Sequence, residues 1–463
     1  MRRGLRAILV TLFIGGTIDG FPAQSEEPPP LRFRPSVGNL ADTIPFFWKG
    51  EYHIFYLHGD IGKVPWEHIV STDLLRWKEL PTALVSDGDP DGPDGEHMFT
   101  GSVIEHDGTF HILYTGWNPR NKEGREWVMH ATSPDLIQWT KHPEHKFRAD
   151  GEHYQNTDFR DPYVFWDRDE KQFRMILCAR DAKTGTPVQG VAQSKDLIHW
   201  NQVEPLELDP PLGKGTPECP DIFKIGDTYY LIHSPSAGTT DMRYSKSLRG
   251  PYKSPTTTAI DTPILYAAKR MFDGNRHILT GWLRDLDGAK DDGGFRWGGD
   301  QSIPREVYPG PNGQLYFRPV SEVLGQYSKS LLDVESTDPT GNAPYDTPRD
   351  YLLDCFIDMK GASEVSVVLR AAGEGDAGYR LTLRPGKQEA AIRGTNFEYA
   401  RPVTFETGKP IHVRAFVEGS LIECFINEAY PFSCRAYEHP DGKLAFEMIG
   451  GAAKVNKLAI RTR

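Results

Sequence analysis

The sequence predicts an all-β protein, a five-bladed β-propeller followed by a C-terminal β-sandwich. Two short motifs recur along residues 31–325, and alternating apolar runs without those motifs fill residues 326–463. The 45 glycines and 36 prolines among 463 residues are typical of a chain with many turns. We therefore expect three segments: residues 1–30 outside the fold, a propeller over residues 31–325, and a sandwich over residues 326–463.

Residues 1–30 are expected to be a signal peptide and a flexible mature terminus. Arginines at positions 2, 3 and 6 precede the apolar run Ala7–Ile14, which is too short to span a bilayer. We expect cleavage near Ala23, with an anchored or uncleaved segment as the alternative. The sequence thus predicts a secreted or periplasmic protein with no membrane span in the mature chain.

The composition is that of a globular protein whose partner is not a nucleic acid. Charged residues make up 25% and hydrophobic residues 38% of the chain, and the net charge is −11 without a basic run. The five cysteines are few for a disulfide framework. Cys424 could pair with Cys434 across an expected turn at Asn427, or both could be free buried thiols.

A hairpin unit occurs five times along the predicted propeller. Its form is an apolar run, a polar turn with Gly or Asp, and a second run of aromatic and apolar residues, as in Phe46–Tyr56 around Lys49-Gly50. The alternation and the turn residues predict a β-hairpin for each copy. The other copies are Val103–Tyr114, Val164–Leu177, Ile222–Ile232 and Ala268–Trp282.

A second unit lies between the hairpins. Ser71-Thr72-Asp73-Leu74-Leu75-Arg76-Trp77 recurs at residues 133–139 and 194–200, and in degenerate form at 245–252. The tryptophans at 77, 139 and 200 are separated by 62 and 61 residues. This spacing indicates one four-stranded sheet per repeat, with the Trp closing each outer edge. Five such sheets around an axis form a propeller.

From about residue 326 the repeats end and short alternating runs follow. Six or more short strands at such spacing predict a β-sandwich. We expect it to brace the propeller, with sugar binding as the alternative. The runs are Tyr351–Met359, Glu364–Leu369, Tyr379–Leu383, Ile411–Glu418, Leu421–Ile426 and Lys443–Met448.

Three acidic residues stand immediately before first strands of predicted blades. They are Asp42 on blade I, Asp161 on blade III and Glu218 on blade IV. The innermost strand of a propeller blade starts near the axial channel, so the three carboxyl groups are expected to converge. Like charges in a partly desolvated site raise the pKa of at least one of them. Paired carboxyl groups, here with Arg160 as a cationic neighbour, are the catalytic groups of enzymes that cleave glycosidic bonds.

Five sequence motifs accompany these carboxyl groups. They are Phe159-Arg160-Asp161-Pro162, Glu218-Cys219-Pro220, Phe99-Thr100-Gly101-Ser102, Trp66-Glu67-His68 followed by residues 70–74, and Trp297-Gly298-Gly299 with residues 302–306. Together they resemble glycoside hydrolase family 32, the invertase, inulinase and levanase family. The resemblance covers roughly residues 33–320, with a weaker likeness to the family's C-terminal sandwich.

The resemblance implies a role for each matched residue. Asp42 would be the nucleophile that forms a covalent glycosyl-enzyme intermediate, and Glu218 the acid and base. Asp161 would hold sugar hydroxyls and stabilise the transition state, pinned by Arg160. Cys219 would pack beside Glu218. The matched residues predicted to contact the oligo- or polysaccharide substrate are Arg160, Cys219, Trp66, His68, Phe99, Thr100 and Trp297.

The segment around the predicted nucleophile departs from the family. The family shows Trp-Met-Asn-Asp-Pro-Asn-Gly, whereas Asn39–Pro45 retains only Asp42, and Leu57 replaces a glutamine. A site that lacks hydrogen-bonding groups discriminates against their ligands. We therefore expect a retaining, β-fructofuranosidase-like hydrolase for which common fructans are not the best substrates.

Two other functions remain open from the sequence. Ala41-Asp42 also resembles family 43, whose members invert configuration and act on arabinofuranosides and xylosides. A propeller that binds carbohydrate without cleaving it is the third possibility. Hydrolysis of a panel of furanosides separates the three.

The sequence predicts neither a metal site nor a cofactor. Residues 87–92 begin like an EF-hand loop, but Met98 stands where the bidentate Glu is required. The histidines at 53, 58, 68, 97 and 111 lack metal-ligand spacing.

Overall fold

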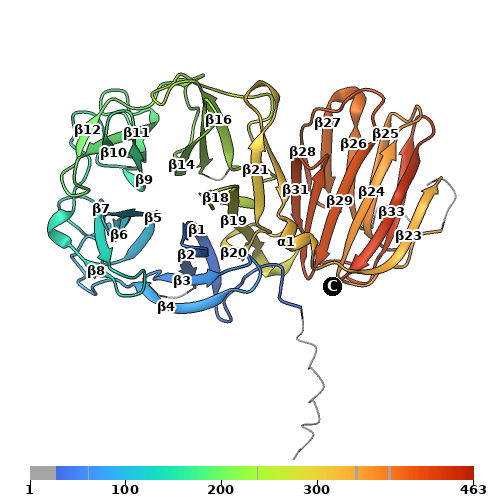
Figure 1. Cartoon of the computed structure of the whole chain (residues 1–463), viewed down its shortest axis with the longest axis horizontal. Helices are drawn as coiled ribbons and strands as arrows, with labels where there is room; N and C mark the ends of the chain where they lie inside the picture. The colour runs from blue at the N-terminus through green and yellow to red at the C-terminus, as the bar shows by residue number, and fades with distance from the viewer. Residues whose placement is uncertain (1–27, 61, 237, 339–342, 374–376) are drawn as a thin grey trace, which may run out of the picture.

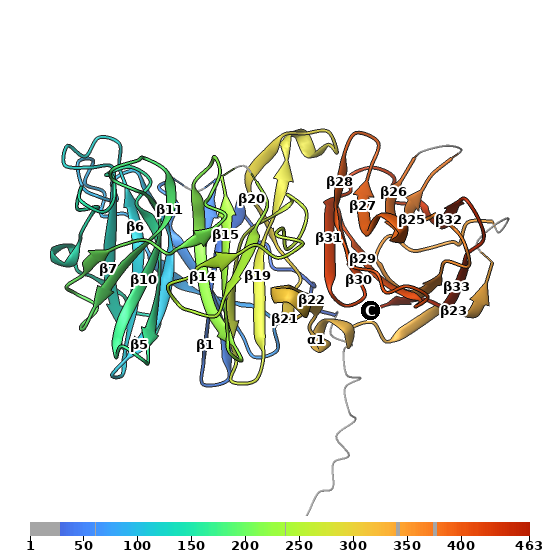
Figure 2. The same cartoon turned by 90° about the horizontal axis from the view of Figure 1, so that it is seen from above.

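The computed structural model describes residues 28–60, 62–236, 238–338, 343–373 and 377–463. The predicted signal peptide therefore lies outside the described residues. Figure 1 shows a ring of sheets beside a layered pair of sheets, and Figure 2 shows the same two parts from above. Among the described helices, none has the length and apolar character needed to cross a membrane.

The ring is a five-bladed propeller, which confirms the predicted fold class, and each predicted hairpin forms the first two strands of one blade. A short strand, β13 (Leu208–Asp209), adds to blade IV beside β17. Blade I contains β1 (Asn39–Trp48), β2 (Glu51–Gly59), β3 (Trp66–Ser71) and β4 (Lys78–Leu84); blade II contains β5 (His97–His106), β6 (Thr109–Trp117), β7 (Glu126–Ser133) and β8 (Thr140–Lys141); blade III contains β9 (Arg160–Asp167), β10 (Gln172–Arg180), β11 (Pro187–Ser194) and β12 (Asn201–Val203); blade IV contains β14 (Pro217–Ile225), β15 (Thr228–Pro235), β16 (Asp241–Ser245) and β17 (Tyr252–Lys253); blade V contains β18 (Leu265–Phe272), β19 (His277–Leu286), β21 (Arg305–Pro309) and β22 (Leu315–Pro319).

The ring is closed by β20 (Phe295–Gln301). This strand pairs with β19 of blade V and, through Gly299 opposite Leu40, with β1 of blade I. Aromatic side chains pack between blades I and II, where the ring of Phe110 lies 5.2 Å from that of Trp48. In Figure 1 the strands β1, β5, β9, β14 and β18 surround the central opening.

The repeated Ser-x-Asp-Leu motif forms the turn that joins the third and fourth strands of a blade. Oδ1 of Asp73 accepts hydrogen bonds from the backbone N–H groups of Leu75 and Arg76 at 3.0 and 2.7 Å. The intervening Leu74 has a φ of 63°. Trp77 directly precedes β4, so the structure places the motif's Trp at the outer strand, as the spacing predicts.

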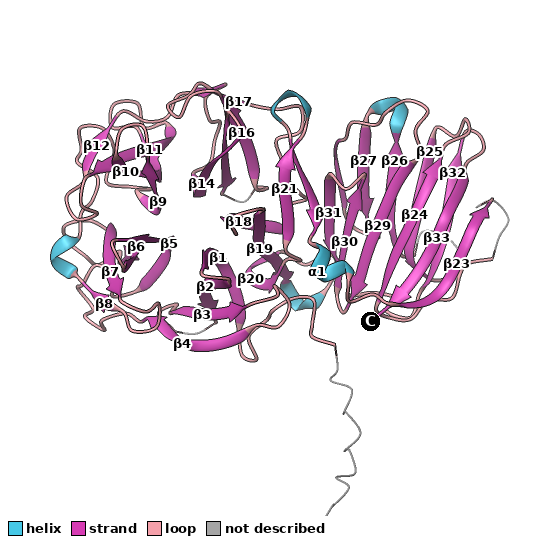
Figure 3. Ribbon diagram, viewed as in Figure 1, coloured by secondary structure: helices cyan, strands magenta, loops and turns pink. Residues whose placement is uncertain are grey.

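The second part is a sandwich of a six-stranded and a five-stranded sheet, drawn in magenta at the right of Figure 3. Each of the six predicted runs forms a strand, and β23, β27, β28, β31 and β33 are additional. Buried side chains from both sheets form one hydrophobic core between them. The first sheet contains β23 (Lys329–Thr337), β33 (Lys454–Thr462), β24 (Tyr351–Asp358), β29 (Ile411–Glu418), β30 (Leu421–Ile426) and β31 (Tyr430–Arg435); the second contains β28 (Glu398–Pro402), β27 (Glu389–Arg393), β26 (Tyr379–Arg384), β25 (Glu364–Ala371) and β32 (Lys443–Ile449).

The segment between the two parts contains one helical turn, α1 (Ser321–Leu324), which follows β22 and precedes β23. The boundary predicted between residues 325 and 326 falls directly after this turn and stays a prediction. The five cysteines are free and buried. Cys434 pairs in register with Ile422 and Cys424 with Phe432, so the two thiols are not opposite one another.

Buried ion pairs join the propeller to the sandwich. Arg305 on β21 is fully buried and lies 2.7 Å from Asp261 of the propeller and 2.7 Å from Glu423 on β30. Glu423 also contacts Arg32, which in turn contacts Glu418 at 2.6 Å. Charges this deeply buried are tolerated only when each one is paired.

The two ends of the described chain meet beside this interface. Nη1 of Arg463 donates a hydrogen bond of 2.6 Å to the carbonyl oxygen of Pro29. The same guanidinium group lies 2.5 Å from Glu418, which also binds Arg32. Arg463 therefore connects Pro29, near the start of the described chain, to Glu418 of the sandwich.

We expect Arg305→Met to lower the free energy of unfolding by about 3–5 kcal/mol, because it leaves the buried Asp261 without its paired cation and Glu423 with Arg32 alone. Arg318→Met on β22 is the matched control, since Arg318 pairs with Glu306 at the surface and such pairs contribute less than about 1 kcal/mol. Urea denaturation of both variants measures the difference. Equal losses in the two variants would contradict a special role for Arg305.

Candidate active site

The innermost strands of the five blades carry an irregularity at the same level. In each of them the pairing with the second strand shifts register, and in blades I to IV the shift lies close to a residue that the sequence analysis singled out. At this position φ is positive for Asp42, Asp161, Cys219 and Ala267, with values of 41, 61, 50 and 48°. A β-bulge re-aims side chains and often lies beside an active site. The bulges therefore direct Asp42 and Asp161 alike, and Glu218 stands one residue before the bulge of β14.

Glu218 is held from two sides by residues at the equivalent level of the neighbouring blades. Nη2 of Arg160 on β9 donates to Oε1 of Glu218 at 2.7 Å, and the hydroxyl group of Tyr266 on β18 donates to Oε2 at 2.5 Å. Arg160 is itself fixed by Glu126 and Asp158 at 3.2 and 2.6 Å. The Glu218 side chain keeps 24% of its surface exposed, so a ligand can reach it.

Asp161 is buried and tied to the strand that carries Glu218. Its Oδ2 accepts a hydrogen bond of 2.9 Å from the backbone N–H of Cys219, and its own N–H donates to Oγ1 of Thr115 at 2.8 Å. Burial raises the pKa of Asp161 to about 6, against the lowering effect of Arg160. The structure thus brings Asp161, Arg160, Glu218 and Cys219 together, as predicted from the sequence.

Asp42 belongs to the same group of charges. Its Oδ1 accepts a hydrogen bond of 3.1 Å from Nε1 of Trp282. Burial, together with the charges of Asp161 and Glu218, raises the pKa of Asp42 to about 7, while Lys269 and Trp282 act in the opposite direction. A carboxyl group with this pKa exchanges its proton near neutral pH.

Three residues of this site, Tyr266, Trp282 and Lys269, were not predicted from the sequence. Lys269 is buried, donates a hydrogen bond of 2.8 Å to the carbonyl oxygen of Gly101, and lowers the pKa of both Asp42 and Asp161. Tyr266 could have been found from the repeats, because it occupies in blade V the position of Glu218 in blade IV. Trp282 ends the fifth predicted hairpin, but nothing in the sequence marked it or Lys269 as functional.

The remaining predicted substrate contacts fall into two groups. Trp297 on β20 is 45% exposed and its ring lies 6.3 Å from that of Trp282, while half-buried Phe99 stacks on Trp117 at 5.6 Å. Trp66, His68 and Thr100 are buried. Nε1 of Trp66 donates to the carbonyl oxygen of Phe99 at 3.1 Å, which positions Phe99. His68 lies on the third strand of blade I, and the structure does not bring it to the carboxyl groups; its role stays a prediction.

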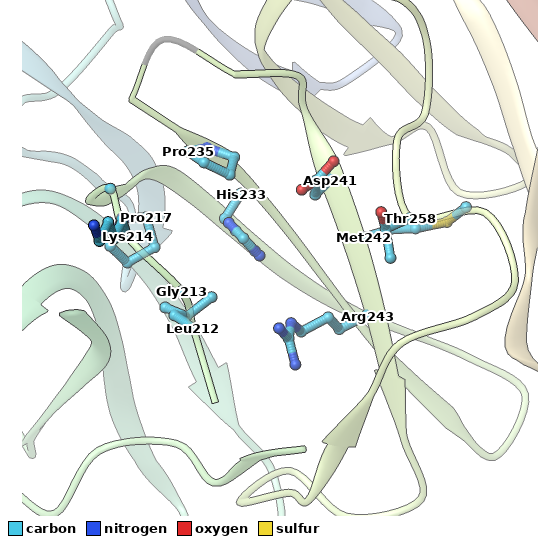
Figure 4. Close-up of a pocket in the computed structure, with 11 residues that line it drawn as sticks. Leu212, Gly213, Lys214, Pro217, His233, Pro235, Asp241, Met242, Arg243 and Thr258 are labelled. Atoms are coloured by element: carbon cyan, nitrogen blue, oxygen red, sulfur yellow. The ribbon is translucent and has the colours of Figure 1, made fainter. Parts of the chain in front are cut away.

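A separate pocket of about 220 Å³ opens within blade IV, as Figure 4 shows. It is lined on one side by Lys214 and Pro217, and on the other by His233, Asp241 and Arg243. Burial lowers the pKa of His233 to about 3, so the imidazole is neutral. Pro217 is the residue before Glu218, but the three carboxyl groups of the candidate site do not line this pocket. It is therefore distinct from the candidate site.

The sequence of residues 33–319 matches the Glycosyl hydrolases family 32 N-terminal domain. Among curated proteins, the chain is 30% identical over 349 residues to an insoluble β-fructofuranosidase isoenzyme of Arabidopsis thaliana, covering 66% of this chain and 58% of the relative. It is 27% identical over 459 residues to the sucrose-6-phosphate hydrolase of Zymomonas mobilis, covering 90% and 88%. The chain spans about three fifths of the length of the plant relatives.

Solved structures share the architecture. The exo-inulinase from Aspergillus awamori superimposes with a TM-score of 0.75 at 17% identity, over 95% of this chain and 99% of that one. The fructan 1-exohydrolase IIa from Cichorium intybus gives a TM-score of 0.76 at 19% identity, over 93% and 96%. At these identities the likeness establishes the fold, a propeller followed by a sandwich.

We expect Asp42→Asn to stabilise the protein at pH 8 and to have little effect near pH 4. The pKa of Asp42 is about 7 in the folded state against about 4 when unfolded, so the folded state binds the extra proton and stability falls as pH rises between these values. A shift of about three pKa units corresponds to at most about 4 kcal/mol. Thermal unfolding of the variant and the parent, measured from pH 4 to pH 8, tests this.

Asp91→Asn is the control for this experiment, because Asp91 is an exposed residue of the loop before β5. It should leave the unfolding temperature unchanged at both pH values. A destabilised Asp42→Asn variant at pH 8 would show that the ionised Asp42 is favoured by its surroundings, contrary to the structure.

Proposed function

Because the chain belongs to glycosyl hydrolase family 32, we propose that it is a retaining glycoside hydrolase of the β-fructofuranosidase type. The observation that carries the proposal is the pairing of two differently held carboxyl groups. Glu218 is gripped by Arg160 and Tyr266, whereas Asp42 is buried against Trp282. When two carboxyl groups lie in different environments, their pKa values differ, and they can take different roles in catalysis.

In the first step Asp42 acts as the nucleophile. Its carboxylate oxygen forms a bond to the anomeric carbon while the bond from that carbon to the leaving oxygen breaks, and Glu218 gives its proton to the leaving oxygen. Lys269 favours the ionised form of Asp42 that this attack requires. Asp161, oriented by the N–H group of Cys219, accepts hydrogen bonds from sugar hydroxyls and faces the positive charge that develops on the ring.

In the second step water replaces Asp42. Glu218, now a carboxylate, takes a proton from the water as the oxygen attacks the anomeric carbon, and the bond to Asp42 breaks. The hydroxyl group of Tyr266 lies 3.3 Å from the carbonyl oxygens of Ser234 and Pro235 as well as beside Glu218. It can therefore donate to Glu218 when that residue is ionised and to a carbonyl when Glu218 is protonated. Tyr266 is a positioning residue for both steps.

The proposed substrate is an oligo- or polysaccharide with a terminal β-fructofuranosyl group. Relatives bear the names β-fructofuranosidase, sucrose-6-phosphate hydrolase and fructan exohydrolase. Ala41, Ile44 and Leu57 are buried and apolar, so they offer the inner sugar no side-chain hydrogen bond. Exposed Trp297 provides an aromatic face on which a sugar ring can stack. We propose that the segment that precedes residue 28 directs export of the protein, and that the protein meets this substrate after export.

A substrate panel tests this function. We expect turnover of nitrophenyl β-D-fructofuranoside, with a lower kcat/KM for sucrose, 1-kestose and levan, because their leaving groups are poor and the inner site lacks the polar partners that would offset this. Nitrophenyl α-L-arabinofuranoside and β-D-xyloside are the controls. Activity confined to the two controls would overturn the fructofuranosidase proposal, and sucrose as the best substrate would contradict our account of the inner site.

The assignment of Glu218 is tested with Glu218→Gln. We expect a loss of about 10²–10⁴-fold in kcat/KM on sucrose, whose leaving oxygen needs a proton, and a much smaller loss on nitrophenyl fructofuranoside. Azide should then restore turnover of the nitrophenyl substrate, because it attacks the Asp42-linked intermediate without needing a base.

The product of azide rescue reports the stereochemistry. A β-fructofuranosyl azide, identified from its anomeric carbon by ¹³C NMR, is the product of two successive displacements. The α-anomer would show that Asp42 does not form a covalent intermediate. Equal losses of Glu218→Gln on both substrates would contradict the role of Glu218 as the acid.

A further inference from the structure

Blade II carries a cluster of histidines on its outer side, distant in the fold from the innermost strands that hold the carboxyl groups. His111 on β6, His130 on β7, and His142 and His145 after β8 lie in one group with Glu144. His142 directly precedes η1 (Pro143–His145), the short helical turn drawn in cyan at the left of Figure 3, and His145 is its last residue.

Three ligand atoms of this group converge. Oε1 of Glu144 lies 3.5 Å from Nδ1 of His142 and 3.7 Å from Nε2 of His145. Among the residues the structure describes, this trio is the one group of three such side chains whose ligand atoms all lie within 4.8 Å of one another. A tetrahedral zinc ion with bonds of about 2.0–2.1 Å separates its ligand atoms by about 3.4 Å. The two distances to Glu144 are close to that edge, and the two histidine nitrogens lie within 4.8 Å of each other.

The surrounding hydrogen bonds are compatible with the tautomers that a metal requires. With one assignment, Nδ1–H of His145 donates to Nδ1 of His130 at 2.9 Å, and Nε2–H of His130 donates to Nδ1 of His111 at 2.9 Å. Nε2–H of His142 donates to Oγ1 of Thr132 at 2.8 Å. The free lone pairs are then on Nδ1 of His142 and Nε2 of His145, the two atoms that face Glu144. The opposite assignment in the chain would point Nε2–H of His145 at Glu144 from 3.7 Å, which is too long for a hydrogen bond.

Blade I provides an internal comparison. His53 and His68 occupy the positions of His111 and His130, and their ring nitrogens also lie 3.0 Å apart. Both are buried, and the ring of His68 stacks on Phe55 at 3.9 Å. In blade II the hydrogen-bonded pair instead extends to His145. The exposed fraction of the side chain is 20% for His145, 25% for His142 and 63% for Glu144. The histidine pair is thus a feature of both blades, and the accessible trio is specific to blade II.

We propose that His142, Glu144 and His145 bind a divalent transition-metal ion, with zinc as the best fit, and that this ion fixes the turn after β8. Water or another small ligand completes the tetrahedron. Thr132 and the relay of His130 and His111 orient the two imidazoles, as outer partners of metal-binding histidines do. This site differs from the expectation from the sequence, which considered only His111 of this group and predicted no metal.

The test is calorimetric titration of the metal-stripped full chain with zinc sulfate, together with its thermal unfolding. We expect one equivalent to bind and to raise the unfolding temperature. His142→Ala and His145→Ala should each weaken binding more than tenfold and remove the thermal shift. Thr132→Val, which keeps the side-chain shape but removes the acceptor for His142, should weaken binding about 10–100-fold.

His199→Ala is the matched control, because His199 is an exposed histidine that pairs with Asp196 at 2.8 Å in the same turn of blade III. It should leave affinity and stoichiometry unchanged. Turnover of the nitrophenyl substrate should be the same for parent, His142→Ala and His145→Ala, which also shows that the variants fold. No saturable zinc binding, binding that survives both histidine substitutions, an equal loss in His199→Ala, or equally tight binding of Mg²⁺ would each overturn the proposal.

Discussion

The bulges of the innermost strands are the constraint on which the candidate active site depends. A regular strand would alternate its side chains between the two faces of the blade, and a carboxyl group at its entrance would point into the space between blades. The bulge gives Asp42 and Asp161 a positive φ and turns them in the same way on two blades. On β14 the bulge falls on Cys219, and its N–H group is thereby free to bind Asp161 while Glu218 meets Arg160 and Tyr266. One local departure from strand geometry, repeated around a ring, assembles the site.

Bringing three carboxyl groups together in a buried site costs free energy. Two cations, Arg160 and Lys269, lie where they reduce this cost. Three carboxyl groups share one low-dielectric region, which would by itself keep more than one of them protonated. Arg160 lies against Glu218 and lowers the pKa of Asp161, and Lys269 acts on Asp161 and Asp42. The buried guanidinium of Arg305 serves a different purpose, because it joins the propeller to the sandwich through two carboxylates. The propeller thus contains one buried charge cluster for reactivity and another for assembly.

The sequence predicted the fold in detail because the determinants are local and repeated. A hairpin turn such as Lys49-Gly50 and an Asp-capped turn such as that at Asp73 specify their own geometry. Five copies of the hairpin then predict a ring of five blades. The carboxyl groups were predicted from their place before apolar runs, although the structure includes them within β1, β9 and β14. Trp282 and Lys269 could not be predicted, since their partners are brought close only by closure of the ring, whereas Tyr266 could have been found from its position in the repeats. The histidine trio was missed for a different reason: His142, Glu144 and His145 are close in sequence, but their hydrogen-bonding partners on β6 and β7 become apparent only when the blade is folded.

The meeting of the two chain ends has a consequence for the connectivity of the molecule. Arg463 donates a hydrogen bond to Pro29 and pairs with Glu418 of the sandwich, so it links the two ends of the described chain. The described chain is therefore nearly a closed loop, in which the order of blades and sheets does not depend on where the backbone begins. A short linker could join residues 29 and 463, and the backbone could be opened instead at an exposed hairpin such as Asp107-Gly108, with every strand pairing and the three carboxyl-bearing innermost strands kept in place.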